Sequence, residues 1–251
     1  MYRPLHCISL RRVRYDDRRS ILTAWSAEAG RVSLIIPDGA GREAARRRAL
    51  TQPLALFEGQ VDQRPGREIL SMRDLRPSAI MAGLAADPAK TLVALFVAEV
   101  LERTLRESAP DDILWRYLTA AIAALDTMPP GPGVANFPPV FLYHLAGCLG
   151  IAPDAGAWRE GLAFDLAAAR FAYAPGLLAA AQGRTAAGNI LTPEQAAWIP
   201  RLARLTLRGG RLLPMPRVLR REMLDIILRY YTLHHTPLDN LRSLPVLTQI
   251  F

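Results

Sequence analysis

The chain has almost no lysine and almost no cysteine. Lys90 is its only lysine, and Cys7 and Cys148 are its only cysteines, far apart and without CxxC spacing. This usage excludes a cysteine-rich zinc site and argues against a disulfide framework. We therefore predict a protein that holds no metal and no other cofactor.

Long apolar runs are missing too. The longest, near residues 140–151, is too short to cross a bilayer. The opening residues Met1-Tyr2-Arg3-Pro4 lead into an alternating pattern and not into the apolar segment of a secretion signal. The sequence therefore predicts a soluble, cytoplasmic protein with no membrane partner.

The motifs of common enzymes are also missing. There is no GxxxxGK[ST] loop, no GxSxG elbow, no HExxH pair and no GxGxxG after a strand. His144 and Cys148 lie four residues apart, but without a third ligand nearby they are interpreted as a packed core pair. His234 and His235 would point in different directions on a helix and are interpreted as solvated helix-end residues. We predict no catalytic residue and no enzymatic activity.

What the chain does have is positive charge carried by arginine. The formal net charge is +8 and the sequence pI is about 10.2. Residues 1–78 hold 15 arginines against nine acids and residues 201–251 nine against three, whereas residues 79–200 are acidic overall. A codon bias toward arginine explains part of this content but does not by itself segregate the charge. We therefore expect a basic surface that meets an anionic partner.

The first 78 residues carry the pattern of a small barrel. Short apolar stretches that read as strands cover residues 5–15, 20–26, 31–36, 54–61 and 69–75. Tight turns join them, and we expect a loop between Pro37 and Pro53 that carries an arginine run. Five short strands in such a length fit an OB-fold, although the pattern alone leaves an SH3-like barrel open.

From residue 79 onward, helical periodicity replaces alternation. The predicted helices cover residues 88–108, 113–126 (N-capped by Asp111), 137–149, 193–208 and 216–235, with a last helical turn at 245–251. A Pro/Gly-rich link at 129–133 precedes the third helix, which is apolar nearly all round and is expected to be buried, with the C-terminal tail folded over it. Residues 153–190 are left open between an Ala-rich helix and a short hairpin.

The arginines on the predicted strands and in the adjoining basic loop are the candidates for following a phosphate backbone. They are Arg11, Arg12, Arg14, Arg18, Arg19, Arg31, Arg42, Arg46, Arg47 and Arg48. Tyr15 and Trp25 are candidate rings for stacking bases, although each fits a core position better. A weaker partner-binding set, expected on an outer helical face, is Arg217, Arg220, Arg221 and Arg229. The alternative is that these charges only solvate the surface.

Several stretches resemble the RecO family of recombination mediators, in its Bacteroidetes-like, zinc-free branch. They are Tyr15-Asp16-Asp17 with ILTAWSAEAGRV (21–32), ANFP (135–138) with HLA (144–146), and YYTLH (230–234) with LRSLPVL (241–247). They lie in order across nearly the whole chain. The resemblance implies an α+β protein with an OB-fold at 1–78, a helical domain at 79–251 and a small inserted subdomain near 153–190, where a hairpin over 164–174 replaces the helix.

The same resemblance implies an activity and partners. The activity is binding of single- and double-stranded DNA, annealing of complementary strands and assistance in loading RecA. The implied partners are RecR and the acidic C-terminal tail of single-strand-binding protein. Many family members hold zinc in the inserted subdomain through four cysteines, which this chain lacks. The alternative function is a non-enzymatic scaffold that binds acidic protein tails, with DNA incidental.

Overall fold

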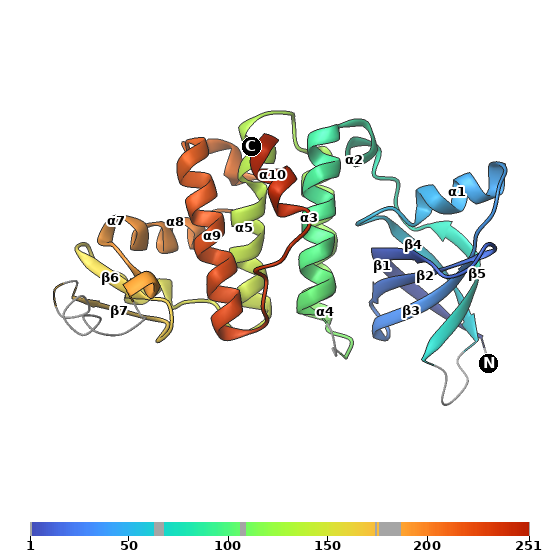
Figure 1. Ribbon diagram of the computed structural model, residues 1–251, viewed down its shortest axis with the longest axis horizontal. Helices are drawn as coiled ribbons and strands as arrows, with labels where there is room; N and C mark the ends of the chain where they lie inside the picture. Colours follow the sequence, from blue (N-terminus) through green and yellow to red (C-terminus); the bar gives the residue numbers. More distant parts are fainter. Residues whose placement is uncertain (1, 63–67, 106–108, 174, 176–186, 251) are drawn as a thin grey trace. The chain divides into compact units, whose positions relative to one another are not determined.

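The N-terminal part of the computed structural model is a closed five-stranded barrel (Figure 1). Its strands are β1 (Tyr2–Arg14), β2 (Arg19–Ser26), β3 (Gly30–Pro37), β4 (Leu56–Asp62) and β5 (Ile69–Pro77). They are ordered β1-β2-β3-β5-β4, with β4 closing on β1 and β3 running parallel to β5. The predicted OB-fold is confirmed. The structure describes residues 2–62, 68–105, 109–173, 175 and 187–250.

Alternation along the strands separates a barrel core from an outer face. Leu22, Val32 and Leu34 point inward and are buried together with Phe57. Trp25 is paired with Ile8 across the two strands, lies outside that cluster and is fully buried as well. The core interpretation of Trp25 is thus correct, and its ring cannot meet a base.

The predicted basic loop contains a helix, α1 (Arg42–Leu50). Gly41 precedes it with φ 95°, a conformation that favours glycine. The prediction of a loop was wrong: residues 42–50, which follow Pro37 and Gly39, are alanine, glutamate, arginine and leucine, all good helix formers, and they form a helix. Only Ala44 of α1 is buried, so most of the helix surface, including its arginines, faces solvent.

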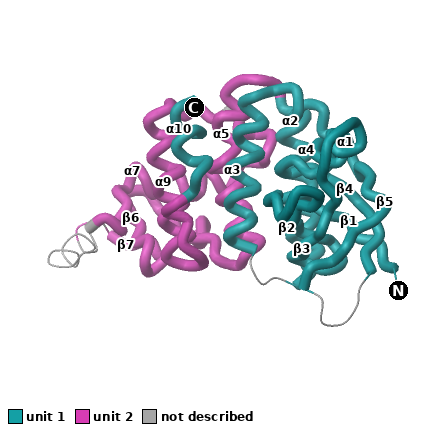
Figure 2. The backbone as a smooth tube through the Cα atoms, turned by 45° about the vertical axis from the view of Figure 1, so that its right-hand side comes forward, with its two compact units in different colours: residues 1–128, 241–250 teal, residues 129–240, 251 magenta. Residues whose placement is uncertain are grey.

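Two compact units make up the chain, and Figure 2 colours them separately. Unit 1 is residues 1–128 with 241–250, and unit 2 is residues 129–240. The predicted domain boundary at residue 78, between the barrel and the helical domain, stays a prediction. Besides the barrel, unit 1 contains the helices α2 (Ala82–Ala86), α3 (Pro88–Thr104), α4 (Asp112–Thr127) and α10 (Leu244–Ile250).

Local capping explains where the helices of unit 1 begin. The carboxylate of Asp87 accepts from the Ala89 amide, and that of Asp111 accepts from the amides of Ile113 and Leu114. The predicted cap at Asp111 is confirmed. The expected last part of the first helix, residues 106–108, lies outside the described residues. The C-terminal helices were expected to cover the helix at 137–149. Residues 217–234 do pack on that helix, whereas α10 packs on α3.

Unit 2 is built around α5 (Pro132–Cys148), whose residues from Gly133 to Leu142 are all buried. The predicted buried helix is confirmed, but it begins inside the expected Pro/Gly-rich link. The other elements of unit 2 are η1 (Ala155–Ala157), β6 (Leu162–Asp165), β7 (Arg170–Tyr173), η2 (Ala187–Asn189), β8 (Ile190–Leu191), α7 (Pro193–Ala196), α8 (Trp198–Arg204), η3 (Gly209–Leu212) and α9 (Arg217–His234).

Residues 153–190, for which the sequence left a helix and a hairpin open, contain a hairpin. β6 and β7 pair antiparallel, and Phe164 opposite Phe171 is fully buried against Tyr230 and neighbouring side chains. This burial overrides the helix propensity of the surrounding alanines. Residues 174 and 177–181, which entered the alternatives, lie outside the described residues.

The helix predicted over 193–208 is broken into α7 and α8. Pro200 has no amide hydrogen to donate to the carbonyl of Ala196, and its ring clashes with that carbonyl in a continuous helix. The break at Ala197 follows from this proline. Among the described residues, no helix combines the length and apolar character that a membrane crossing requires.

Candidate nucleic-acid interface

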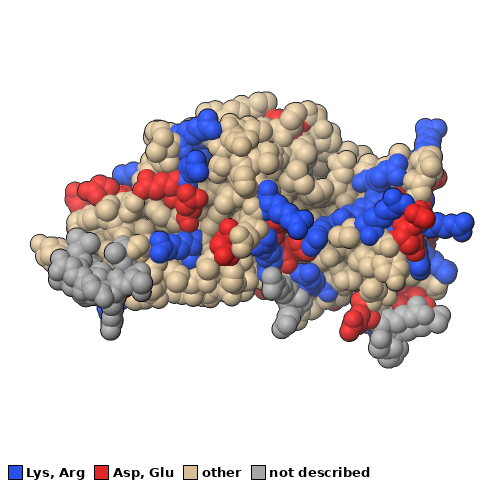
Figure 3. Space-filling model, viewed as in Figure 1, with Lys and Arg blue, Asp and Glu red and all other residues tan. Residues whose placement is uncertain are grey.

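Eight of the ten arginines predicted to contact DNA are carried by strand β1, the β1–β2 turn, the first position of β2 and α1. We call them the arginine-rich end; they are Arg12, Arg14, Arg18, Arg19, Arg42, Arg46, Arg47 and Arg48. The Asp38 amide donates to the Arg18 carbonyl (2.6 Å), and Arg47 donates to the Pro37 carbonyl (3.2 Å). These bonds bring the turn, the end of β3 and α1 together, and Figure 3 shows the positive charge gathered over the barrel.

Asp38 binds several side chains of the arginine-rich end. Its carboxylate pairs with Arg12 at 2.8 Å and with Arg48 at 3.5 Å, and it accepts from the Ser20 hydroxyl at 2.6 Å. Hydrogen bonds from Ser20 and from the Gly39 amide, followed by the Arg12 guanidinium, hold the pKa of Asp38 far below its usual value. Asp38 is therefore a permanent anion that fixes the direction of two guanidinium groups.

Several arginines of this end hold the fold together. Arg12 also donates to the Thr51 hydroxyl (2.9 Å), and Arg48 donates to the Gly39 carbonyl (2.9 Å). With Arg47, they tie the last turn of α1 to the barrel. Arg47 and Arg48 also lie where cations suit the negative end of the helix dipole.

A second group is open to a ligand. Arg18, Arg42 and Arg46 are exposed, and none of their guanidinium groups has a hydrogen-bond or carboxylate partner among the residues that the structure describes. Arg42 and Arg46 stand four apart on α1 and thus share one face. Arg14 pairs with Asp17 at 2.6 Å, but both side chains are largely exposed, so solvent and salt weaken that pair.

Tyr15 lies just beyond β1 and does not belong to the core. It is 59% exposed, so the core interpretation of this ring was wrong. The Arg19 guanidinium lies over the ring, 5.2 Å from its centroid, and is held there by Asp16 at 2.6 Å. The hydrogen bond from Arg19 lowers the pKa of Asp16, so this carboxylate stays charged at neutral pH.

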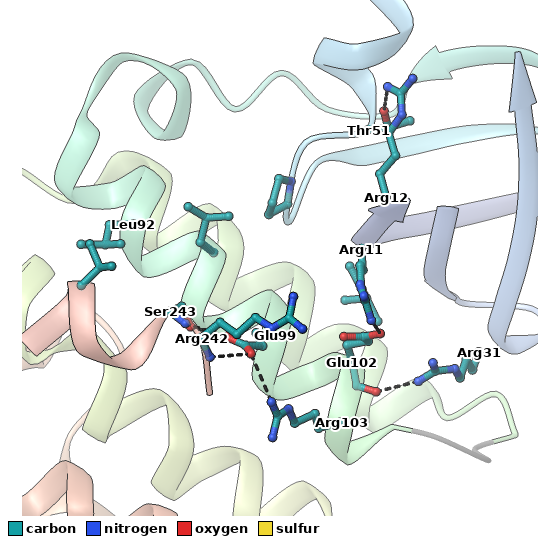
Figure 4. Close-up of a pocket in the computed structure, with 14 residues that line it drawn as sticks. Arg11, Arg12, Arg31, Thr51, Leu92, Glu99, Glu102, Arg103, Arg242 and Ser243 are labelled. Atoms are coloured by element: carbon teal, nitrogen blue, oxygen red, sulfur yellow. Dashed lines mark hydrogen bonds and ion pairs between the residues drawn. The ribbon is translucent and has the colours of Figure 1, made fainter. Parts of the chain in front are cut away.

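Arg11 and Arg31 line a groove of about 1000 Å³ within unit 1, between β1 and α3, which Arg12 of the arginine-rich end also borders (Figure 4). Arg11 pairs with the Glu102 carboxylate at 3.0 Å. Arg31 donates to the main-chain carbonyls of Glu102 (2.6 Å) and Leu105 (3.3 Å) at the C-terminal end of α3. Arg31 thus binds the negative end of this helix, and Arg11 binds a carboxylate on its last turn, so both are less available to DNA.

The groove brings in two arginines that the sequence reasoning missed, Arg103 and Arg242. The Glu99 carboxylate accepts from the amides of Arg242 (2.8 Å) and Ser243 (2.9 Å) and from the Ser243 hydroxyl (2.6 Å), and pairs with Arg103 at 3.3 Å. No spacing in the sequence relates residue 99 to residue 242, so no local signal could have found this site.

The groove also has an aliphatic wall. Leu95 is 44% exposed and Val246 48% exposed, and Leu92 lies beside them. The residues that line the groove include no aromatic side chain. It can therefore receive an aliphatic group between guanidinium groups, but it offers no ring on which a base could stack.

The four arginines predicted as a weaker partner-binding set also differ in exposure and bonding. Arg217, Arg221 and Arg229 are exposed on α9. Arg220 is only partly exposed and donates to the Asn136 side-chain oxygen (2.8 Å) and the Met215 carbonyl (2.9 Å), and burial lowers its pKa. The expectation that all four lie on an outer face is wrong for Arg220, which holds unit 2 together.

Cys7, His144 and His234 take structural positions. His144 and Cys148 are only partly buried, so their interpretation as a packed core pair was wrong. Cys7 is buried in the barrel core, where desolvation raises the pKa of its thiol and keeps it protonated. His144 hydrogen-bonds the Leu205 carbonyl (2.6 Å), and His234, expected to be solvated, hydrogen-bonds the Leu166 carbonyl (2.6 Å). Within the described residues, no three His, Cys, Asp or Glu side chains are arranged to hold a metal ion.

Comparison with known proteins assigns the chain to a family. The family model for the N-terminal part of recombination protein O matches residues 4–81, and the model for its C-terminal part matches residues 85–245. The chain belongs to the RecO family. The DNA repair protein RecO of Phocaeicola vulgatus is 32% identical over 244 residues, and that of Bacteroides fragilis 31%, each match covering 97% of both chains. That of Porphyromonas gingivalis is 30% identical over 248 residues.

Membership in the RecO family supports a role in DNA repair and recombination. The barrel from residue 4 onward and the arginine-rich end fall inside the N-terminal match, and the helices from α3 to α9 fall inside the C-terminal match.

Proposed function

We propose that this chain is a recombination mediator that binds single- and double-stranded DNA, anneals complementary strands and assists RecA loading together with RecR. The observation that carries the proposal is the exposed, unpaired set Arg18, Arg42 and Arg46 beside an OB-fold barrel. Guanidinium groups without a carboxylate partner can replace the counterions of phosphates, which is the main source of affinity for DNA.

The same exposed arginines would also promote the annealing of complementary strands. Two complementary strands repel each other through their phosphates, and a protein that neutralises both backbones lowers that repulsion. Only base pairs form, so the proposed role needs no catalytic residue. RecR and the acidic tail of single-strand-binding protein are proposed partners.

The proposal is tested by the rate at which labelled complementary oligonucleotides anneal. We expect the triple variant Arg18→Glu, Arg42→Glu and Arg46→Glu to lose most of the acceleration. These side chains make no contact that holds the described fold together, so the melting temperature should stay near that of the wild type.

A matched control carries the same change of charge elsewhere. Arg170, Arg204 and Arg208 are also exposed, and their replacement by glutamate should leave annealing nearly intact. Wild-type annealing by the first variant would contradict the proposal, and an equal loss in both variants would show that only total charge matters.

A second candidate function, a scaffold for acidic peptide tails, is favoured by the groove in unit 1. Its exposed aliphatic side chains Leu95 and Val246 stand next to Arg103 and Arg242, which suits a peptide with acidic and aliphatic groups. Arg242→Glu with Val246→Asp should abolish binding of a labelled peptide of the single-strand-binding-protein tail and leave DNA binding intact. Equal peptide affinity in this variant and the wild type would exclude the groove.

A further inference from the structure

The β1–β2 turn carries an exposed aromatic ring at the edge of the arginine-rich end. Tyr15 is 59% exposed, and the guanidinium of Arg19 covers one face of its ring at 5.2 Å. A tyrosine that served only to fill space would be covered by apolar neighbours. More than half of this residue is open to solvent, so ring surface is left for a ligand.

The arrangement beneath the ring is fixed. Asp16 holds Arg19 through two contacts, from Nε at 2.7 Å and from Nη2 at 2.6 Å, and its second carboxylate oxygen accepts from the Arg18 amide at 2.9 Å. The Tyr15 amide donates to the Arg19 carbonyl at 2.9 Å, which closes the turn. The guanidinium is therefore pre-positioned against the ring, and less side-chain entropy is lost when a ligand arrives.

The neighbours of the ring have the chemistry of a backbone site. Arg18, which precedes Arg19 in the turn, is exposed, and its guanidinium has no partner among the described residues. The Arg18 carbonyl accepts from the Asp38 amide, which leads to α1. A ring backed by the Asp16-held guanidinium of Arg19, with the unpaired guanidinium of Arg18 next to it in the chain, matches the combination that binds single strands, in which cations meet phosphates and aromatic rings stack bases.

We propose that Tyr15, backed by Arg19, is a stacking platform for an unpaired base and gives the arginine-rich end a preference for single-stranded DNA. The inference rests on the proposed DNA binding and deepens it. In a duplex the base faces are covered by their neighbours in the stack, so only the phosphate contacts of this end remain. The platform therefore adds affinity for single strands alone.

The test compares the affinity for a labelled single-stranded oligonucleotide with that for the same sequence as a duplex, measured by anisotropy with full-length protein. Tyr15→Ala should weaken single-strand binding by about 5- to 150-fold, the usual effect of losing one base–aromatic stack, and leave duplex binding unchanged. Tyr15→Phe keeps the ring and should keep the affinity.

Tyr173→Ala is the matched control, because Tyr173 is also a highly exposed tyrosine, on the hairpin of unit 2. It should change neither affinity. Equal losses on single strand and duplex after Tyr15→Ala, or no loss on either, would overturn the platform while leaving DNA binding in place. A wild-type protein that binds neither substrate would overturn the proposed function instead.

Discussion

Glu99 on α3 is predicted to hold the C-terminal residues 241–250 against that helix. Its carboxylate accepts three hydrogen bonds at the start of α10, from the amides of Arg242 and Ser243 and from the Ser243 hydroxyl. A hydrogen bond to a charged group contributes about 1.5–3 kcal/mol, but the Glu99 side chain is 18% exposed and water replaces part of the loss. We expect Glu99→Ala to cost about 2–4 kcal/mol in the local stability of residues 242–250.

Native-state hydrogen exchange measures that local stability directly. A loss of 2–4 kcal/mol accelerates exchange through local opening by roughly 30- to 1000-fold in peptides that cover 241–250. Glu102→Ala is the matched control on the same helix, since Glu102 makes one ion pair with a mostly exposed arginine. Its effect on these amides should be small. Unchanged exchange of 241–250 in Glu99→Ala would refute the anchoring role.

The same carboxylate gives the tail a dependence on pH. Burial alone would raise the pKa of Glu99, but the hydrogen bonds from Ser243 and from the amides of Arg242 and Ser243 outweigh it and hold the pKa below the usual 4.5. A lowered pKa contributes stability that is present above about 4.5 and is lost as the pH falls through the folded-state value. Protection of 241–250 should therefore decrease below pH 4.5, and Glu99→Gln should remove that decrease.

Two further outcomes are expected. His6 lies between Glu28 (2.5 Å) and Glu58 (3.1 Å), and the hydrogen bond that its ring donates to Glu28 raises its pKa above 6.5. The stability that His6 contributes is therefore full below about pH 6.5 and fades as the pH rises through the folded-state value. His6→Gln should flatten the dependence of the melting temperature on pH in that range, and an unchanged dependence would contradict this. Asn136 is fully buried, donates to the carbonyls of Gly210 and Leu213 and accepts from Arg220. Asn136→Ala should lower the free energy of unfolding, measured by urea denaturation, by about 2–4 kcal/mol. A loss below about 1 kcal/mol would mean that water replaces these hydrogen bonds.

The parts of the fold that could be predicted from the sequence are those decided by neighbours along the chain. Alternation in β2 and β3 depends on residues two apart, and the cap at Asp111 depends on amides two and three residues later. The misassigned α1 also lies within local reach, because its alanines and charged residues favour a helix and only the flanking proline and glycine obscured it.

The candidate site depends on contacts that the sequence does not encode locally. Arg31 and Arg42 look equivalent in the chain, yet Arg31 binds carbonyls at the end of α3 and Arg42 faces solvent. Tyr15 and Trp25 are likewise both aromatic residues near the ends of strands. Trp25 is fully buried within β2, and Tyr15 lies one residue past the end of β1 and is exposed. Only the folded chain separates these pairs.

The central claim, that the arginine-rich end binds phosphates, is tested most directly by the salt dependence of single-stranded DNA binding. Each arginine–phosphate contact contributes about 0.7 to the slope of log K against log salt. Replacing Arg18, Arg42 and Arg46 by glutamate should therefore weaken binding and flatten the slope by at least about 2 units relative to the wild type. An affinity and a slope equal to those of the wild type would show that DNA, if bound at all, is bound elsewhere.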